Sequence, residues 1–221
     1  MLNIEIKKNP LYEFTKRLVD IAFSVVLIIL FLPLIIIVGI AIKLDSLGPI
    51  LADTPERVGK NGRPFKMYKF CSMIRNAHEI LRENPKYVKL LEQYKKGSYK
   101  LRDDPRITRI GRFIRHHSLD EIPQLFNVLK GDMSIVGPRA YYSDELREQQ
   151  KKYKGTEHLV KIVLSVKPGI TGYWQVSGRS EINFDKRIQM DAQYVKRRSI
   201  VYDFWLMLKT PWAMIAGKGA L

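Results

Sequence analysis

The longest hydrophobic stretch of the chain carries no charge. Residues 21–42 read IAFSVVLIILFLPLIIIVGIAI. As one helix, this run would extend for about 33 Å, enough to cross the hydrocarbon core of a bilayer. A helix buried in a soluble core usually keeps a polar stripe, and this run has none. We therefore expect a membrane segment over residues 16–44, preceded by an amphipathic lead-in over residues 1–15.

The flanks of this segment bear on its topology. Basic residues stand on both sides of it, with Lys16 and Arg17 before the apolar run and Lys43 after it. Positive charge marks the cytoplasmic side of a membrane. Pro33, near the middle, removes a helical hydrogen bond and favours a kink. These features predict a helix that breaks near Pro33 and returns to the same face; a straight span is the alternative.

The remaining pattern predicts short strands among amphipathic helices. The sequence VGKNGRPFKMYKF indicates a hairpin, because Asn61-Gly62 is a strong signal for a tight turn. A loop-and-strand stretch covers KPGITGYWQVSGR. Helices are expected over residues 73–98 (interrupted near Pro85), 109–117, 122–129, 143–165, 184–198 and 200–215. The fold class is therefore α/β, a helix-rich α+β domain over residues 45–221, with residues 1–44 as lead-in and re-entrant membrane helix and with amphipathic helices at the interface.

Composition points to an anionic partner. The chain has 38 Lys and Arg against 22 Asp and Glu, a formal charge of +16. This balance suits nucleic acid, acidic lipid or a phosphorylated substrate, although a soluble protein with a basic surface has the same composition. The single cysteine, Cys71, excludes a disulfide within the chain.

The candidate chemistry centres on HHSLDEIPQL. Asp120 and Glu121 are adjacent acids at the start of an expected helix, where backbone N–H groups favour an anion. An ionised carboxylate there suits a nucleophile or a metal ligand. Helix capping explains the same residues, with Ser118 in a Ser-x-x-Glu box or with Asp120 as the cap. The residues alone leave capping and catalysis equally open.

Arginines accompany this acidic pair. Arg109, Arg112 and Arg115 recur at helical spacing before it, and Arg139 and Arg179 follow glycine-rich turns. The planar guanidinium matches phosphate oxygens, so the set suggests a diphosphate site. For any single arginine, a solvated basic face or a lipid headgroup contact is the simpler interpretation. The motifs of P-loop NTPases, dinucleotide-binding folds and zincins are absent from the sequence.

Six stretches together give a specific resemblance: KRLVDIAFS, RVGKNGRPFKMYKF, DDPRITRIGRFIR, SLDEIPQLFNVLKGDMSIVGPR, KPGITGYWQVSGR and GKGA. From about Lys16 to Ala220 the chain resembles the bacterial sugar transferases, the monotopic phosphoglycosyl transferases. The resemblance implies transfer of a sugar 1-phosphate from a UDP-sugar to undecaprenyl phosphate, with release of UMP. The chain would start the assembly of a polysaccharide, O-antigen, capsule or glycoprotein glycan on the cytoplasmic face of the bacterial inner membrane.

The resemblance also assigns residues. Asp120 and Glu121 match the family's catalytic pair, with Asp120 as nucleophile and both as ligands of Mg²⁺. Substrate binding falls on Lys69, Arg115, Arg139, Arg179 and Asp191. The implied partners are the UDP-sugar, undecaprenyl phosphate and membrane lipid, with no nucleic acid; a homo-oligomer is left open.

Three positions depart from the family pattern. Leu32 stands where a serine often precedes the membrane proline, Cys71 replaces a basic residue after Tyr-Lys-Phe, and residues 52–54 differ from a more aromatic run. Cys71 and residues 52–54 leave room for an inactive membrane-anchored scaffold as a competing interpretation. A second competitor is an anchored protein that binds anionic lipid or nucleic acid through its basic face.

Overall fold

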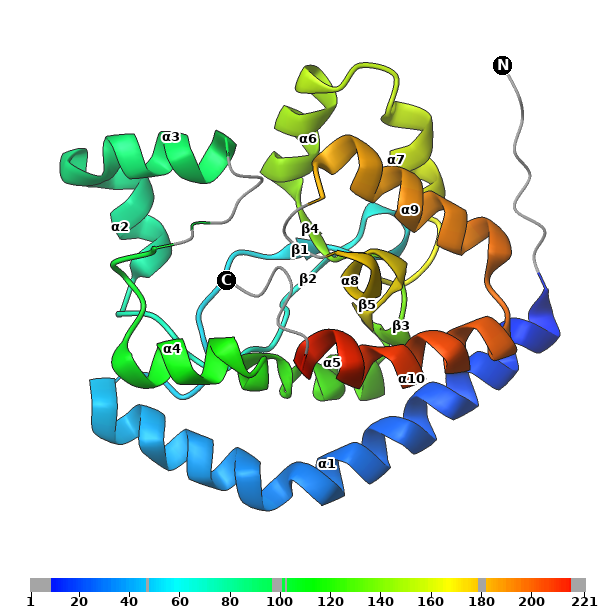
Figure 1. Cartoon of the computed structure of the whole chain (residues 1–221), viewed down its shortest axis with the longest axis horizontal. Helices are drawn as coiled ribbons and strands as arrows, with labels where there is room; N and C mark the ends of the chain where they lie inside the picture. The colour runs from blue at the N-terminus through cyan, green and yellow to red at the C-terminus, as the bar shows by residue number, and fades with distance from the viewer. Residues whose placement is uncertain (1–8, 47, 97–100, 102, 179–181, 216–221) are drawn as a thin grey trace.

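A computed structural model gives the fold of residues 9–46, 48–96, 101, 103–178 and 182–215. Helices dominate, and the strands are short (Figure 1). The α-helices are α1 (Pro10–Ser46), α2 (Ala77–Glu83), α3 (Val88–Lys96), α4 (Arg109–His116), α5 (Gln124–Lys130), α6 (Ser143–Lys152), α7 (Glu157–Val163), α8 (Tyr173–Ser177), α9 (Phe184–Arg197) and α10 (Ile200–Ile215). Three 3-10 turns are η1 (Lys60–Gly62), η2 (Pro85–Tyr87) and η3 (Leu119–Glu121).

The apolar run lies within α1, which begins earlier than expected. Asn9 caps the helix, because its Oδ1 accepts a hydrogen bond from the Tyr12 amide at 3.1 Å. Pro10 follows at the first helical position, where its missing N–H costs nothing. The helix is not interrupted at Pro33, so the predicted break is wrong in that form. The ribbon instead bends near its middle (Figure 1), as expected where one helical hydrogen bond is missing.

Polar anchors attach the first half of α1 to the rest of the protein. Asp20 is buried and accepts hydrogen bonds from Ser134 Oγ at 2.7 Å and from the Ile135 amide at 3.0 Å. Arg17 donates to the carbonyls of Val128 and Leu129 at the end of α5. The outward face of α1 is apolar and exposed, including Leu11, Leu18, Val26, Ile29, Leu30, Ile36, Ile37 and Ile40. By length and composition, α1 could cross a membrane.

The strands form two small sheets. The first has the order β2-β1-β4, in which β1 (Arg57–Val58) pairs antiparallel with both β2 (Pro64–Phe65) and β4 (Tyr141–Tyr142). The predicted hairpin is therefore confirmed, and its turn contains Asn61 and Gly62 with positive φ. The second sheet pairs β3 (Ser134–Val136) in parallel with β5 (Gly169–Thr171). Neither β3 nor β4 was predicted.

Most of the later helices follow the apolar periodicity. The predicted helix over residues 73–98 divides at Pro85 into α2, η2 and α3, and the one over residues 143–165 divides into α6 and α7. The expected loop after β5 contains the short helix α8, which the prediction missed. The last two helices, α9 and α10, match their predicted ranges within three residues.

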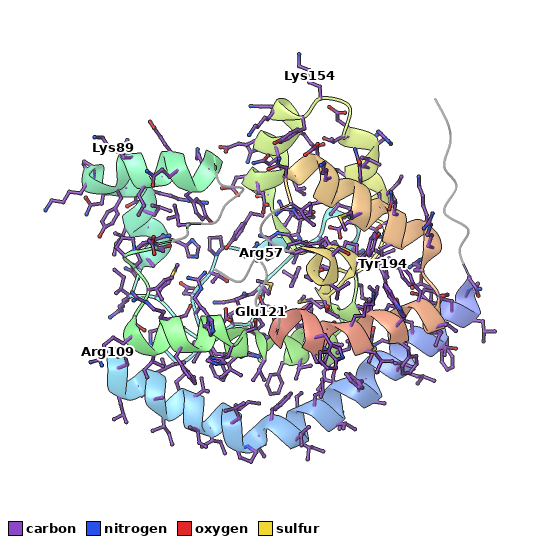
Figure 2. All side chains as sticks on the ribbon, viewed as in Figure 1. Arg57, Lys89, Arg109, Glu121, Lys154 and Tyr194 are labelled. Carbon is purple, nitrogen blue, oxygen red and sulfur yellow. The ribbon has the colours of Figure 1, made fainter. Side chains whose placement is uncertain are left out.

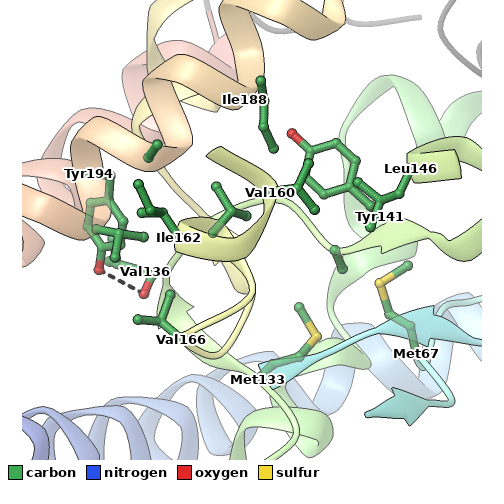
Figure 3. Close-up of a cluster of buried hydrophobic side chains, with 14 of the residues drawn as sticks. Met67, Met133, Val136, Tyr141, Leu146, Val160, Ile162, Val166, Ile188 and Tyr194 are labelled. Carbon is green, nitrogen blue, oxygen red and sulfur yellow. Dashed lines mark hydrogen bonds between the residues drawn. The ribbon is translucent and has the colours of Figure 1, made fainter. Parts of the chain in front are cut away.

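The main core lies between the β3–β5 pair and helices α6, α7 and α9. Figure 3 shows it, with Met67 and Met133 at one end and Val160, Ile162 and Ile188 at the other. Tyr194 of α9 donates a hydrogen bond from its buried hydroxyl to the Val136 carbonyl at 3.1 Å. This core fixes the loop after β3, which carries Arg139 of the candidate site.

Candidate active site

The acidic pair lies in the turn between α4 and α5. Thr108 caps α4, since its Oγ1 accepts a hydrogen bond from the Gly111 amide at 2.9 Å. After His116 the chain reverses through Ser118, whose φ of 56° is left-handed, and forms the 3-10 turn η3. The Phe70 amide donates to the Asp120 carbonyl at 3.0 Å. This bond holds the segment after β2 against the acidic pair.

The capping interpretation is wrong. The Ser118 side chain makes no capping hydrogen bond, and the residue that precedes α5 is Pro123. The carboxylates face Lys69 instead. Its Nζ lies 2.7 Å from Glu121 Oε1 and 3.4 Å from Asp120 Oδ2. Asp120 is buried, whereas the Glu121 side chain is partly exposed.

Burial and charge act in opposite directions on this cluster. Burial raises the pKa of Asp120, the Lys69 ammonium lowers it, Glu121 raises it and Arg115 lowers it more weakly; the net pKa is raised. Burial also lowers the pKa of Lys69, but the charges of Glu121 and Asp120 outweigh it and the net pKa is raised. Lys69 therefore stays protonated, and its ammonium favours the carboxylate form of the buried Asp120.

A cavity of about 1470 Å³ opens beside the acidic pair. Asp120, Glu121, Lys69, Arg115 and Arg139 all line it. One part of its wall is polar and comes from the β1–β4 region and α2, with Arg57, His78 and Tyr142. Another part is apolar and comes from α1 and α10, with Phe23, Leu27, Phe31, Met207 and Pro211. The cavity is large enough for a ligand with both polar and apolar portions.

Arg115 and Arg139 reach the cavity from different elements. Arg115 lies in the last turn of α4, and its buried Nη1 has no hydrogen-bond partner. Arg139 lies between β3 and β4, with its guanidinium carbon 5.4 Å from the Trp174 ring centroid. Its buried Nε is also unpartnered in hydrogen bonds, 3.9 Å from Glu145 Oε1. Both guanidinium groups keep donors for an anionic ligand.

Other residues suggested by the sequence lie elsewhere. Asp191 is fully buried in α9, outside the cavity wall, and accepts hydrogen bonds from the Arg139 amide at 3.2 Å and from the Tyr141 hydroxyl at 2.9 Å. Asp191 therefore holds the backbone of Arg139 in place from the side of α9. Arg109 and Arg112 are exposed on the outer side of α4. Arg179 lies outside the described residues, as do residues 1–8 and the closing GKGA stretch.

Two features of the wall escaped the sequence reasoning. Arg57 lines the cavity from β1, and the alternation of the hairpin could have indicated that its side chain points inward. Trp174 and Gln175 line it from α8, the helix that was not predicted. Cys71, the departure from the family pattern, also lines the cavity and donates its Sγ–H to the Met73 carbonyl.

The acidic pair can take part in a divalent-cation site that a substrate completes. Among the described residues, no group of three or more His, Cys, Asp or Glu side chains could hold a metal ion. Mg²⁺, however, commonly uses one or two carboxylates together with substrate phosphates and waters. Asp120 and Glu121 fit that pattern, in which the cation is shared with a bound diphosphate.

Comparison with known proteins agrees with the family resemblance of the sequence. The bacterial sugar transferase family matches residues 11–217. The undecaprenyl-phosphate galactose phosphotransferase of Salmonella typhimurium is 42% identical over 208 residues, which cover 94% of this chain and 42% of that protein. The undecaprenyl-phosphate glucose phosphotransferase of Komagataeibacter xylinus is 38% identical, over 93% of this chain and 37% of that protein.

The chain thus spans less than half the length of these two relatives. It spans more of the exopolysaccharide production protein ExoY of Rhizobium meliloti, which is 34% identical over 96% of this chain and 90% of that protein.

Proposed function

The chain belongs to the bacterial sugar transferase family, and we propose that it transfers a sugar 1-phosphate from a UDP-sugar to undecaprenyl phosphate. Two relatives that are named as undecaprenyl-phosphate sugar phosphotransferases support this assignment. One structural observation carries it: a buried carboxylate, Asp120, faces a lysine and opens into a cavity whose wall also holds Arg57, Arg115 and Arg139. Two negatively charged phosphates can approach a carboxylate only where cations offset the repulsion.

The reaction is a double displacement at one phosphorus. A carboxylate oxygen of Asp120 attacks the β-phosphorus of the UDP-sugar, and the bond from that phosphorus to the bridging oxygen breaks. The bridging oxygen keeps the electron pair and departs with UMP. The phosphate of undecaprenyl phosphate then attacks the aspartyl phospho-sugar, which restores the carboxylate and forms the lipid diphosphate-sugar. No proton is required if Asp120 is ionised.

The surrounding residues have separate roles in this scheme. Lys69 and Arg115 favour the ionised form of Asp120 and offset the charge of the incoming β-phosphate. Arg139 presents a guanidinium whose position Asp191 and Glu145 support. Asp120 and Glu121 would hold Mg²⁺, which would supply positive charge against the phosphates.

The position of the site relative to α1 suits a lipid acceptor. The α4–η3–α5 segment that carries Asp120 packs on α1. Apolar side chains of α1 and α10 form the adjacent part of the cavity wall. A polyprenyl chain can lie along these side chains with its phosphate at the nucleophile. We place residues 1–44 at the inner membrane as a re-entrant anchor, bent near Pro33, and residues 45–221 on its cytoplasmic face.

The competing functions lack comparable support. A basic face that binds nucleic acid or acidic lipid needs no buried carboxylate paired with lysine in a cavity. The scaffold interpretation rests on Cys71 and residues 52–54, and Cys71 fits into the cavity wall without displacing the acidic pair.

The test is UMP release from a panel of UDP-sugars by detergent-solubilised protein with Mg²⁺ and undecaprenyl phosphate. We expect lipid-dependent release by the wild type and none by Asp120→Asn. The panel member that reacts identifies the sugar. Release of UDP in place of UMP would show that the sugar moves without its phosphate and would overturn the proposal.

A further inference from the structure

Arg57 is a buried arginine without a carboxylate partner. Arg57 is 8% exposed. Among the described residues, no Asp or Glu oxygen lies within 4 Å of its guanidinium nitrogens. The other two buried arginines in the described part of the chain each have a carboxylate partner. Arg106 pairs with Asp104, and Arg187 pairs with Glu145 at 2.8 Å. A buried cation is costly unless an anion compensates it, so Arg57 calls for an anion that is not part of the described chain.

The protein holds the Arg57 guanidinium without using all its donors. The guanidinium carbon lies 3.3 Å from the centroid of the Tyr142 ring, and Nη1 donates to the Ala140 carbonyl at 3.1 Å. Nε has no hydrogen-bond partner. A stacked, oriented guanidinium with remaining donors is suited to binding a phosphate. Figure 2 labels Arg57 and Glu121 in the interior of the molecule, with Glu121 on the side of α1.

Arg57 and Lys69 line the same cavity from the two arms of one hairpin. Arg57 pairs with Phe65 across the β1–β2 ladder, and Lys69 follows four residues after Phe65. Lys69 contacts the nucleophile, whereas Arg57 stands with His78 and Tyr142 on the polar wall. Two cationic side chains that line one cavity from the two arms of the hairpin suit the two phosphates of a diphosphate.

We propose that Arg57 binds the α-phosphate of the nucleoside diphosphate donor, the group that leaves as UMP; this assignment rests on the proposed function. The β-phosphate lies at Asp120 and Lys69. When the bond to the bridging oxygen breaks, the electron pair stays on that oxygen, and the α-phosphate goes from one negative charge to two. A guanidinium at that phosphate therefore stabilises the transition state more than the bound substrate.

The experiment measures binding of UMP and of uridine to detergent-solubilised protein by calorimetry. Arg57→Gln removes the charge and keeps a shorter polar side chain. Arg63→Gln is the matched control, because Arg63 lies on the same hairpin and is exposed outside the cavity wall. We expect Arg57→Gln to weaken UMP binding about 10- to 100-fold, the range for a charged hydrogen bond, and to leave uridine binding unchanged. Arg63→Gln should bind UMP as the wild type does.

Arg57→Lys keeps the charge but loses the stacked plane, and it serves if Arg57→Gln does not fold. It should give an intermediate loss of UMP affinity. UMP binding of wild-type strength by either folded variant would overturn the proposal, as would an equal loss of uridine binding or a wild type that does not bind UMP. These outcomes are independent of turnover. An Arg57-dependent UMP site in a wild type that releases no UMP from any UDP-sugar would refute the proposed function and keep the site.

Discussion

The Nζ atom of Lys69 lies 2.7 Å from Oε1 of Glu121, although 52 residues of chain separate the two. The same ammonium lies 3.4 Å from Asp120. One lysine therefore serves both acids of the candidate site, and its removal would leave two carboxylates together in a largely buried place.

Lys69→Met should reduce turnover about 100-fold or more at neutral pH, the usual scale for losing a group that stabilises charge at a reacting centre. Lys69 lowers the pKa of Asp120 against the effect of burial. Without Lys69 that pKa rises further, so the acid limb of the rate–pH profile should move to higher pH. The measurement is kcat/KM for the UDP-sugar between pH 5 and 9, with Lys69→Arg as the variant that keeps the charge. If the acid limb of Lys69→Met lay at the same pH as that of the wild type, Lys69 would not control the pKa of Asp120.

Asp191 should make stability depend on pH. Burial raises the pKa of this carboxyl from 3.8 to about 7. The native state therefore holds the proton more tightly than the unfolded state, and the stabilisation from this group is full below about pH 4 and lost as pH rises through 7. The slope is at most about 1.4 kcal/mol per pH unit. The free energy of unfolding should fall more between pH 5 and pH 8 for the wild type than for Asp191→Asn. Parallel losses would contradict the raised pKa.

Gly111→Ala should destabilise the protein and displace Arg115. A Cβ at Gly111 would overlap the backbone carbonyl of Ser72, which cannot move aside as a flexible side chain could. We expect a loss of about 1–3 kcal/mol, the range for overpacking a well-packed site. The control is Gly39→Ala, where the nearest atom to a new Cβ is Ile50 Cγ2 at 3.5 Å, an ordinary contact. Thermal unfolding of both variants in one detergent gives the comparison.

The junction of α1 with α10 should depend on Asp203. This carboxylate accepts hydrogen bonds from the hydroxyls of Tyr12 and Tyr194 and pairs with Lys16 at 2.8 Å. Asp203→Ala leaves a largely buried ammonium without this partner, so we expect a loss of about 3 kcal/mol. Glu13→Gln, which removes the more exposed pair with Arg198, should cost less than about 1 kcal/mol. Equal effects of the two changes in thermal unfolding would contradict this account.

The bend in α1 gives a test of membrane topology. Leu11 and Leu44 are exposed near the two ends of the helix. In a Cys71→Ser background, Leu11→Cys and Leu44→Cys should both react with an impermeant maleimide from the cytoplasmic side of sealed vesicles. Pro33→Leu restores a helix hydrogen bond and should favour a straight span, which moves one of these positions to the other side. Labelling of the two ends from opposite sides in the protein with Pro33 would refute the re-entrant anchor.

The turns and helices that depend on residues close together in the chain were determined by the sequence itself. Asn61 and Gly62 fix the hairpin, because few residues adopt the positive φ that its turn requires. The uncharged run predicts a long apolar helix, and helical periodicity places α4, α9 and α10. The residues of the site could also be proposed from local stretches, since the family resemblance is carried by such stretches.

Only the tertiary structure decided how these residues meet. The capping and catalytic interpretations of Asp120 were equally consistent with the local sequence. The structure shows no side-chain capping hydrogen bond from Ser118 and places Asp120 beside Lys69, 51 residues away. The parallel pairing of Ser134 with Gly169 joins segments whose alternation indicates no partner. Arg57 gained its significance from burial on Tyr142 without an acid nearby. Long-range packing sets these relationships because the burial of one side chain depends on every element around it, and no short window of sequence contains those elements.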